Sequence, residues 1–139
     1  MIVAHGNQAE SIDLKLLGPL LRRRRVDLGQ TLEEASQELG VCHQTLYKWE
    51  HGIRPPHLQL YPRIVTYLGY EPWPEDRLSF GARLRLARLR LGLSRQHLAE
   101  RLGISWSAYE RWEDGKITQV HARERRLLME FLKTGIGKD

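Results

Sequence analysis

Four long polar side chains share one side of a short stretch that ends at a glycine. They are His43, Gln44, Tyr47 and Lys48. Leu46 and Trp49, three residues apart, form an apolar side opposite to them, which predicts a helix over about 43–51. An apolar back with a front of hydrogen-bonding side chains suits the major groove of DNA.

The same pattern returns 63 residues later, over 102–115, with a second such helix at about 106–114. A shift of 63 aligns residues 17–69 with the second half of the chain without a gap. The positions that carry identical residues are Gly18, Leu21, Arg22, Arg25, Leu28, Gly29, Leu39, Gly40, Trp49, Glu50 and Gly52. This repeat predicts two modules of about fifty residues each.

Local signals place the other helices of the first module. A helix over about 18–28 begins near Pro19, and we expect Leu21, Val26 and Leu28 to form its inner side. The run Arg22-Arg23-Arg24-Arg25 winds right round this helix, so its members cannot share one role.

Thr31 and Glu34 have the spacing of a capping box, which starts a second helix that ends at Leu39 and buries Ala35. Cys42 stands where a capping hydroxyl is expected before the third helix, and it is interpreted as a Ser-like cap or as a redox-sensitive thiol. A short helix near 57–60 and a last helix over about 62–68 follow.

The expected domains are residues 1–69, which include a polar tail over 1–11, and residues 80–139. A linker over 70–79 contains two prolines around a tryptophan. Tyr70 and Trp73 favour a linker anchored on a module over a merely flexible tether.

Charge and composition narrow the function. The net charge is +5, and residues 80–133 hold twelve basic against six acidic residues, whereas 17–69 hold seven against five. A basic module favours a polyanionic partner, although a solvated Arg-rich surface fits equally well. One cysteine, no apolar run that could span a bilayer and no secretory pattern at the start lead us to expect a cytoplasmic protein without a membrane segment.

Each module resembles a helix-turn-helix domain of the Cro/phage-repressor type, the Xre family. The motifs of the first module are Leu28-Gly29-Gln30-Thr31, Leu39-Gly40-Val41 and Trp49-Glu50-His51-Gly52, and those of the second are Leu91-Gly92-Leu93-Ser94, Leu102-Gly103-Ile104-Ser105 and Trp112-Glu113-Asp114-Gly115. The resemblance implies an all-α chain of two tandem five-helix, lambda-repressor-like domains. It also implies that helix 3 of each enters the major groove of double-stranded DNA while helix 2 crosses the backbone.

The resemblance also implies the residues that contact DNA. Base readers in the first module are His43, Gln44, Tyr47 and Lys48, and their equivalents in the second are Trp106, Ser107, Glu110 and Arg111. Arg95, Arg54 and Lys116 are expected to contact phosphates. Trp106 departs from the small polar residue usual in the family, so it either meets a thymine methyl group or packs on its own module. The resemblance further brings Arg25 to Glu50, and Arg88 to Glu113, as ion pairs.

The sequence thus predicts a sequence-specific transcriptional regulator, bacterial or phage in character, that places two modules on neighbouring half-sites. Two alternatives stay open: a protein-interaction or accessory factor of antitoxin-like character, and an architectural factor in excision or conjugation control. A further homodimer through the C-terminal helices is also left open. No catalytic pair, metal-ligand spacing or phosphate-binding loop is recognisable, so neither an enzyme nor a cofactor is expected.

Overall fold

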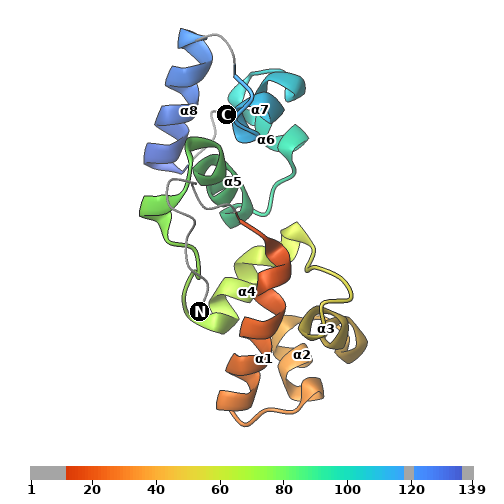
Figure 1. The fold of residues 1–139 in the computed structure, drawn as a ribbon. Coiled ribbons are helices and arrows are strands. Elements are labelled where there is room, and N and C mark those ends of the chain that lie inside the picture. Colours follow the sequence, from red (N-terminus) through yellow and green to blue (C-terminus); the bar gives the residue numbers. More distant parts are fainter. Residues whose placement is uncertain (1–11, 118–120, 136–139) are drawn as a thin grey trace. The chain divides into compact units, whose positions relative to one another are not determined.

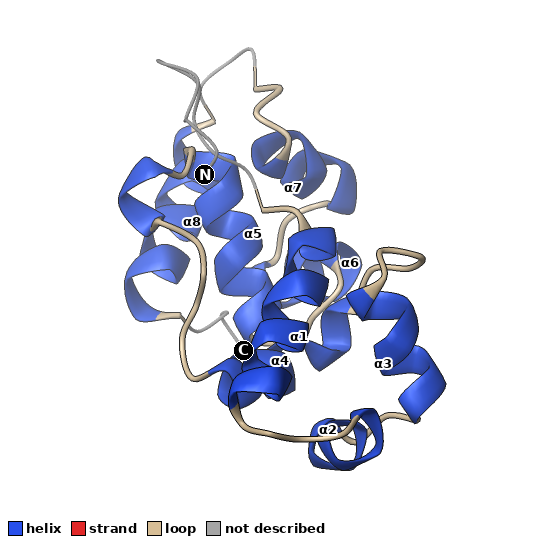
Figure 2. Ribbon diagram, turned by 60° about the horizontal axis from the view of Figure 1, so that its bottom comes forward, coloured by secondary structure: helices blue, strands red, loops and turns tan. Residues whose placement is uncertain are grey.

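The structure is a computed structural model that describes residues 12–117 and 121–135. The regular secondary structure of these residues is helical (Figures 1 and 2). The chain divides into two compact units. Residues 13–72 form the first unit, and the described residues of the second unit are Ile12, 73–117 and 121–135.

The first unit contains four α-helices and two short 3-10 turns. The helices are α1 (Leu17–Asp27), α2 (Leu32–Leu39), α3 (His43–Glu50) and α4 (Tyr61–Leu68), and the turns are η1 (Leu14–Leu16) and η2 (Leu58–Leu60). α3 packs against both α1 and α2, and α4 closes the other side of the same two helices (Figure 1). Their contact surfaces meet in an apolar core that includes Leu21, Leu39, Leu46, Trp49 and Ile64.

The second unit repeats this arrangement. It contains η3 (Glu75–Arg77), α5 (Phe80–Arg90), α6 (Arg95–Leu102), α7 (Trp106–Glu113) and α8 (Ala122–Thr134). The first three helices of the two units correspond residue for residue at an offset of 63, as the sequence repeat predicts. α7 packs on α5 and α6, and α8 packs on α5, around a core centred on Tyr109, Trp112 and Phe131.

Five helices are expected in each module, but the described residues of each unit form four α-helices. In the first unit the short fourth helix is the 3-10 turn η2, which runs directly into α4. Pro62 lies in the first turn of α4 and has no N–H, so the α-helix cannot extend further back. Arg125 takes this place in the second unit and donates its N–H to the carbonyl of His121 at 2.9 Å, so a single helix, α8, begins at Ala122.

The predicted helix caps hold, with one exception. Thr31 and Glu34 form the capping box, and the buried Ala35 and Leu39 follow it. Cys42 occupies the predicted N-cap position of α3, but its side chain does not form the capping hydrogen bond that a serine would make there. Its Sγ lies 3.1 Å from Thr45 Oγ1, and this hydrogen bond lowers the pKa of the thiol.

The inner side predicted for the first helix is only partly right. Leu21 is fully buried, but Val26 and Leu28 are 59% and 45% exposed. The helical period places Arg24 and Arg25 on the inner side of the last turn instead, where Arg24 donates to the carbonyl of Tyr67 at 3.0 Å. The arginine run therefore does divide its roles, since Arg22 and Arg23 stay exposed.

The segment expected to be the linker is anchored by one of its two aromatic side chains. Trp73 is buried, whereas Tyr70 is half exposed. Tyr70–Pro72 belongs to the first unit and Trp73–Ser79 to the second.

One glycine in each unit allows the first helix to touch the end of the third. A Cβ placed on Gly18 would overlap the carbonyl of Trp49, and one placed on Gly81 would overlap the carbonyl of Glu113. Both clashes are with backbone, which cannot rotate away. The contact explains why the repeat keeps glycine inside a helix, where it is otherwise unfavourable.

We expect Gly18→Ala to lower the free energy of unfolding of the first unit by about 1–3 kcal/mol, the usual cost of overpacking. An alanine in an unobstructed helix would instead stabilise it by roughly 0.5–1 kcal/mol. Amide hydrogen exchange in residues 13–72 measures the free energy of unfolding of the first unit. Arg23→Ala, at an exposed position on the same helix, is the control. A stabilised Gly18→Ala protein would contradict the close approach.

Candidate nucleic-acid interface

The four predicted base readers of the first unit lie together on the outer face of α3. Leu46 and Trp49 are 1% and 2% exposed and fix the opposite face in the core. His43, Gln44 and Tyr47 are exposed, and Lys48 is partly exposed. Tyr47 stacks on the ring of His51, with the ring centroids 3.9 Å apart. The structure thus brings the predicted residues together as one polar face.

The outer face of α7 is assembled in the same way from different side chains. Tyr109 and Trp112 are buried beneath it, while Ser107 and Arg111 are exposed and Glu110 is partly exposed. Trp106 is 54% exposed, so packing on its own unit covers only about half of it.

In each unit an arginine of the first helix forms the predicted ion pair with the glutamate that ends the third helix. Arg25 donates from Nε and Nη2 to the two carboxylate oxygens of Glu50, at 2.8 and 2.9 Å. Arg88 binds Glu113 in the same way, at 2.9 and 2.8 Å. Both carboxylate side chains are 1% exposed. Each pair therefore ties the end of a DNA-reading candidate helix to the body of its unit.

Both arginines use a further donor that the sequence does not reveal. Nη1 of Arg25 donates to the carbonyl of Gln30 at 3.1 Å, and Nη1 of Arg88 donates to the carbonyl of Leu93 at 3.0 Å. The bond fixes the turn between the first two helices. Every residue has a backbone carbonyl, so the sequence contains no signal that predicts this hydrogen bond.

The second unit enlarges this ion pair into a network. Glu113 also accepts from Tyr109 Oη at 2.6 Å and from Arg95 Nε at 3.0 Å. The equivalent positions of the first unit hold Leu46 and Leu32. Sequence reasoning missed Tyr109, although a hydroxyl where the repeat has a buried leucine indicates a buried polar partner.

The network sets the protonation of its members. Burial alone would raise the pKa of Glu113, but the hydrogen bonds and charge of Arg88, with help from Tyr109 and Arg95, bring it below its ordinary value. Burial and the neighbouring carboxylate raise the pKa of Tyr109. Glu113 is therefore a buried anion that needs its donors.

Arg95, expected at a phosphate, is bound to three carboxylates. Besides Glu113, it donates from Nη1 to Glu110 at 3.2 Å and from Nη2 to Asp114 at 3.0 Å. Burial opposes its charge, but these carboxylates raise its pKa. Asp114 is a second partner that the sequence reading missed. The phosphate contact of Arg95 stays a prediction.

Arg54 and Lys116 lie in the turns that follow α3 and α7, and both are exposed. These turns are folded back by matching bonds, from the N–H of Ile53 to the carbonyl of Lys48 at 2.9 Å and from the N–H of Lys116 to the carbonyl of Arg111 at 2.8 Å. The two cations thus flank the polar faces, although Lys116 corresponds to Ile53 and not to Arg54.

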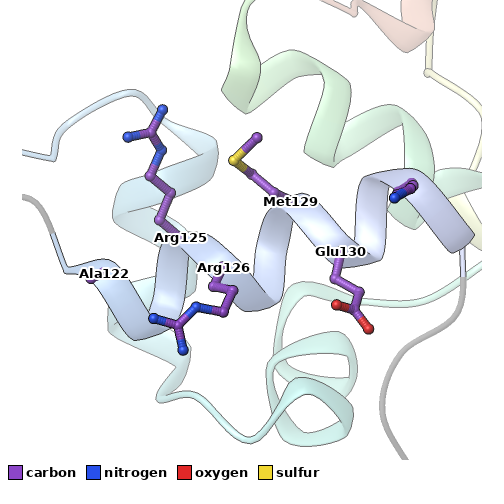
Figure 3. Close-up of a pocket in the computed structure, with 6 residues that line it drawn as sticks. Ala122, Arg125, Arg126, Met129 and Glu130 are labelled. Atoms are coloured by element: carbon purple, nitrogen blue, oxygen red, sulfur yellow. The ribbon is translucent and has the colours of Figure 1, made fainter.

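A shallow hollow along α8 gathers basic side chains of the second unit. It is lined by Ala122, Arg125, Arg126, Met129, Glu130 and Lys133 (Figure 3). Met129 is half exposed in this hollow, between charged neighbours. The homodimer through the C-terminal helices stays a prediction.

Two kinds of site are not found in the part of the chain that the structure describes. No three His, Cys, Asp or Glu side chains there are grouped to hold a metal ion. None of the described helices has the length and apolar character needed to cross a membrane.

The repeated frame has a counterpart among known proteins. A family model described as a helix-turn-helix domain matches residues 16–78 and again residues 79–136. The chain belongs to this helix-turn-helix family. One match covers most of each unit, although the first match extends to residue 78, beyond the end of the first unit at Pro72, so both units are helix-turn-helix domains in tandem.

One relative of this helix-turn-helix protein comes from Methanothermobacter thermautotrophicus (strain Delta H). It is described as an uncharacterized HTH-type transcriptional regulator and is 42% identical over 52 residues, which are 37% of this chain and 75% of that relative. No solved structure gives a significant match.

We expect Glu50→Gln and Glu113→Gln each to lower the free energy of unfolding of their own unit by about 3–5 kcal/mol, because each strands a largely buried arginine. Amide exchange resolved by unit measures the loss. Glu75→Gln serves as the control, since Glu75 forms an exposed pair with Arg90 in which both side chains are about half exposed. An unchanged unit would contradict the role of the pair.

The second unit should also lose stability in acid. Because the pKa of Glu113 is lowered in the folded state, its contribution is complete above the ordinary carboxyl pKa of about 4.3 and is lost as the pH falls through the lower folded value. The melting temperature of the second unit, measured between about pH 6 and pH 2, should therefore fall less steeply with decreasing pH in Glu113→Gln than in the wild type. Exposed Glu130→Gln should retain the wild-type slope; parallel curves for Glu113→Gln and wild type would refute the assignment.

Proposed function

We propose that this chain is a sequence-specific regulator of transcription, similar to the Xre family, that binds double-stranded DNA with α3 and α7 in the major groove. The observation that carries the proposal is the duplicated frame, which buries one side of each helix and turns a different set of hydrogen-bonding side chains outward. The helix-turn-helix family and the regulator named among its relatives support the same conclusion.

The base contacts follow from the chemistry of the outward side chains. On α3, Gln44 can pair with adenine and Lys48 can donate to guanine, with His43 and Tyr47 beside them. On α7, Arg111 suits guanine and Ser107 suits either base of a pair. Trp106 is exposed enough to meet a thymine methyl group.

Phosphate contacts come from the flanking cations. Arg54 and Lys116 are exposed at the ends of the two polar faces. Contacts of this kind fix register and add affinity for any sequence, because they release counterions.

Two domains on one chain allow one molecule to occupy two neighbouring half-sites. Binding of the first domain raises the effective concentration of the second at its site, which tightens overall binding. The half-sites should differ in sequence, because α3 and α7 share none of their outward residues.

A protein-docking role for the second domain is the alternative that one observation favours. Trp106 is 54% exposed, one helical turn before Glu110 on the same face of α7, and aromatic residues are enriched at protein interfaces. The selection below separates the two proposals, because a docking domain would leave no second half-site.

Selection of bound fragments from a random pool of double-stranded DNA tests the function. We expect a bipartite motif, and in Gln44→Ala a loss of about 1–3 kcal/mol of base discrimination at one position of one half-site. Exposed Gln59→Ala, in η2, is the matched control and should leave the motif intact. An equal loss on selected and random DNA would count against base reading by α3.

Arg54→Ala should act differently from Gln44→Ala. Affinity should fall alike on selected and random DNA, and the slope of log K against log salt should decrease by about one. Exposed Arg23→Ala is the control for the loss of one positive charge. Loss of base preference in Arg54→Ala would show that its role has been misassigned.

A further inference from the structure

Glu110 projects from the outer face of α7 with one carboxylate oxygen held and the other available. Oε2 accepts from Arg95 Nη1 at 3.2 Å, and the side chain is 44% exposed. Among the described residues no hydrogen-bond donor is found for Oε1. A carboxylate is thus presented at the proposed DNA-facing surface in a restrained orientation.

Arg95 is itself fixed from several directions. It is the first residue of α6, directly after the capping Ser94. Its Nε donates to Glu113, whose side chain is 1% exposed, and its Nη2 donates to Asp114 at 3.0 Å. A guanidinium bound at Nε, Nη1 and Nη2 has little freedom to move, so its hydrogen bond restrains the orientation of the Glu110 carboxylate.

Arg95, Glu110 and Asp114 are replaced together in the first domain. The equivalent residues there are Leu32, Tyr47 and His51. Leu32 shows that the shared frame folds without an arginine at this position. The three charged groups therefore form an arrangement of their own, which the second domain adds to the frame.

We propose that Glu110 selects cytosine in the half-site of the second domain, and that Arg95 is the positioning residue that aims it. The proposal rests on the proposed function. A carboxylate only accepts hydrogen bonds, and cytosine offers its N4 amino group in the major groove. Guanine offers O6 and N7 there, thymine O4, and adenine an N7 beside its amino group, so each of these sets an acceptor against the carboxylate.

The same charges argue against a phosphate contact by Arg95. Its guanidinium already faces Glu110, Glu113 and Asp114, at 3.0 to 3.2 Å. A phosphate beside it would add a fourth negative charge to that group. An exposed cation such as Arg54, for which no ion pair is found among the described residues, suits the backbone better.

The test compares motifs selected from a random pool by the full chain and by three variants, Glu110→Gln, Arg95→Leu and Glu130→Gln. The wild type should select cytosine at one position of the second half-site, with roughly 5- to 150-fold discrimination. Glu110→Gln should change that position to adenine, because an amide can accept from N6 and donate to N7. Glu130→Gln removes the same charge from α8 and should leave the motif unchanged.

Arg95→Leu installs the residue of the first domain. Cytosine discrimination should fall at that position, while the first half-site and the salt dependence stay as in the wild type. Far-ultraviolet circular dichroism tests whether Arg95→Leu is folded. If Arg95→Leu is not folded, the base preference of Glu110→Gln alone tests the proposal.

Three outcomes would overturn the inference while leaving the proposed function standing. They are a second half-site without cytosine dependence, an equal gain in affinity for all sequences in Glu110→Gln, and a salt slope reduced by about one in Arg95→Leu with base preference intact. If no fragment is selected at all, the proposed function fails instead.

Discussion

A buried carboxylate at the end of the third helix is the constraint on which each domain depends. Glu50 and Glu113 are 1% exposed, and each is bound through both oxygens by an arginine of the first helix. Removing such a charge from water is costly unless its hydrogen bonds are complete. The geometry that completes them fixes where the third helix ends. Gly18 and Gly81 then allow the first helix to approach the backbone of that same end.

This constraint separates stability from recognition. The ion pair, the glycine contact and the buried tryptophan all lie on the inner side of α3 and α7. The outer side bears none of these contacts, so its residues can differ completely between the domains while the helices keep their register. One frame can thereby present Gln44 and Lys48 in one domain, and Glu110 and Arg111 in the other.

The second domain couples the inner and outer sides of α7. Arg95 links the buried Glu113 to Glu110 and Asp114 on the surface. A change at the outer face of α7 therefore reaches the buried Glu113. The first domain lacks this connection, because Leu32 and Leu46 replace Arg95 and Tyr109 there. The excess positive charge of this domain also lies away from the network, on helices such as α8, where Arg123, Arg125 and Arg126 are exposed.

The sequence by itself determined the repeat, the helix boundaries around Thr31 and Gly40, the inner and outer sides of α3 and α7, and the two ion pairs. The repeat, the boundaries and the two sides of α3 and α7 follow from local periodicity, capping chemistry and positions that both modules share, whereas the ion pairs follow from those shared positions together with the resemblance to the Xre family. Only the tertiary structure decided which side of α1 is buried beyond Leu21, since Arg24 and Arg25 fill the inner side by bonding to distant groups that a hydrophobic pattern does not register. It likewise decided that Arg95 meets three carboxylates. Such a network depends on where α6 starts relative to the end of α7, and that distance is set by packing across the core.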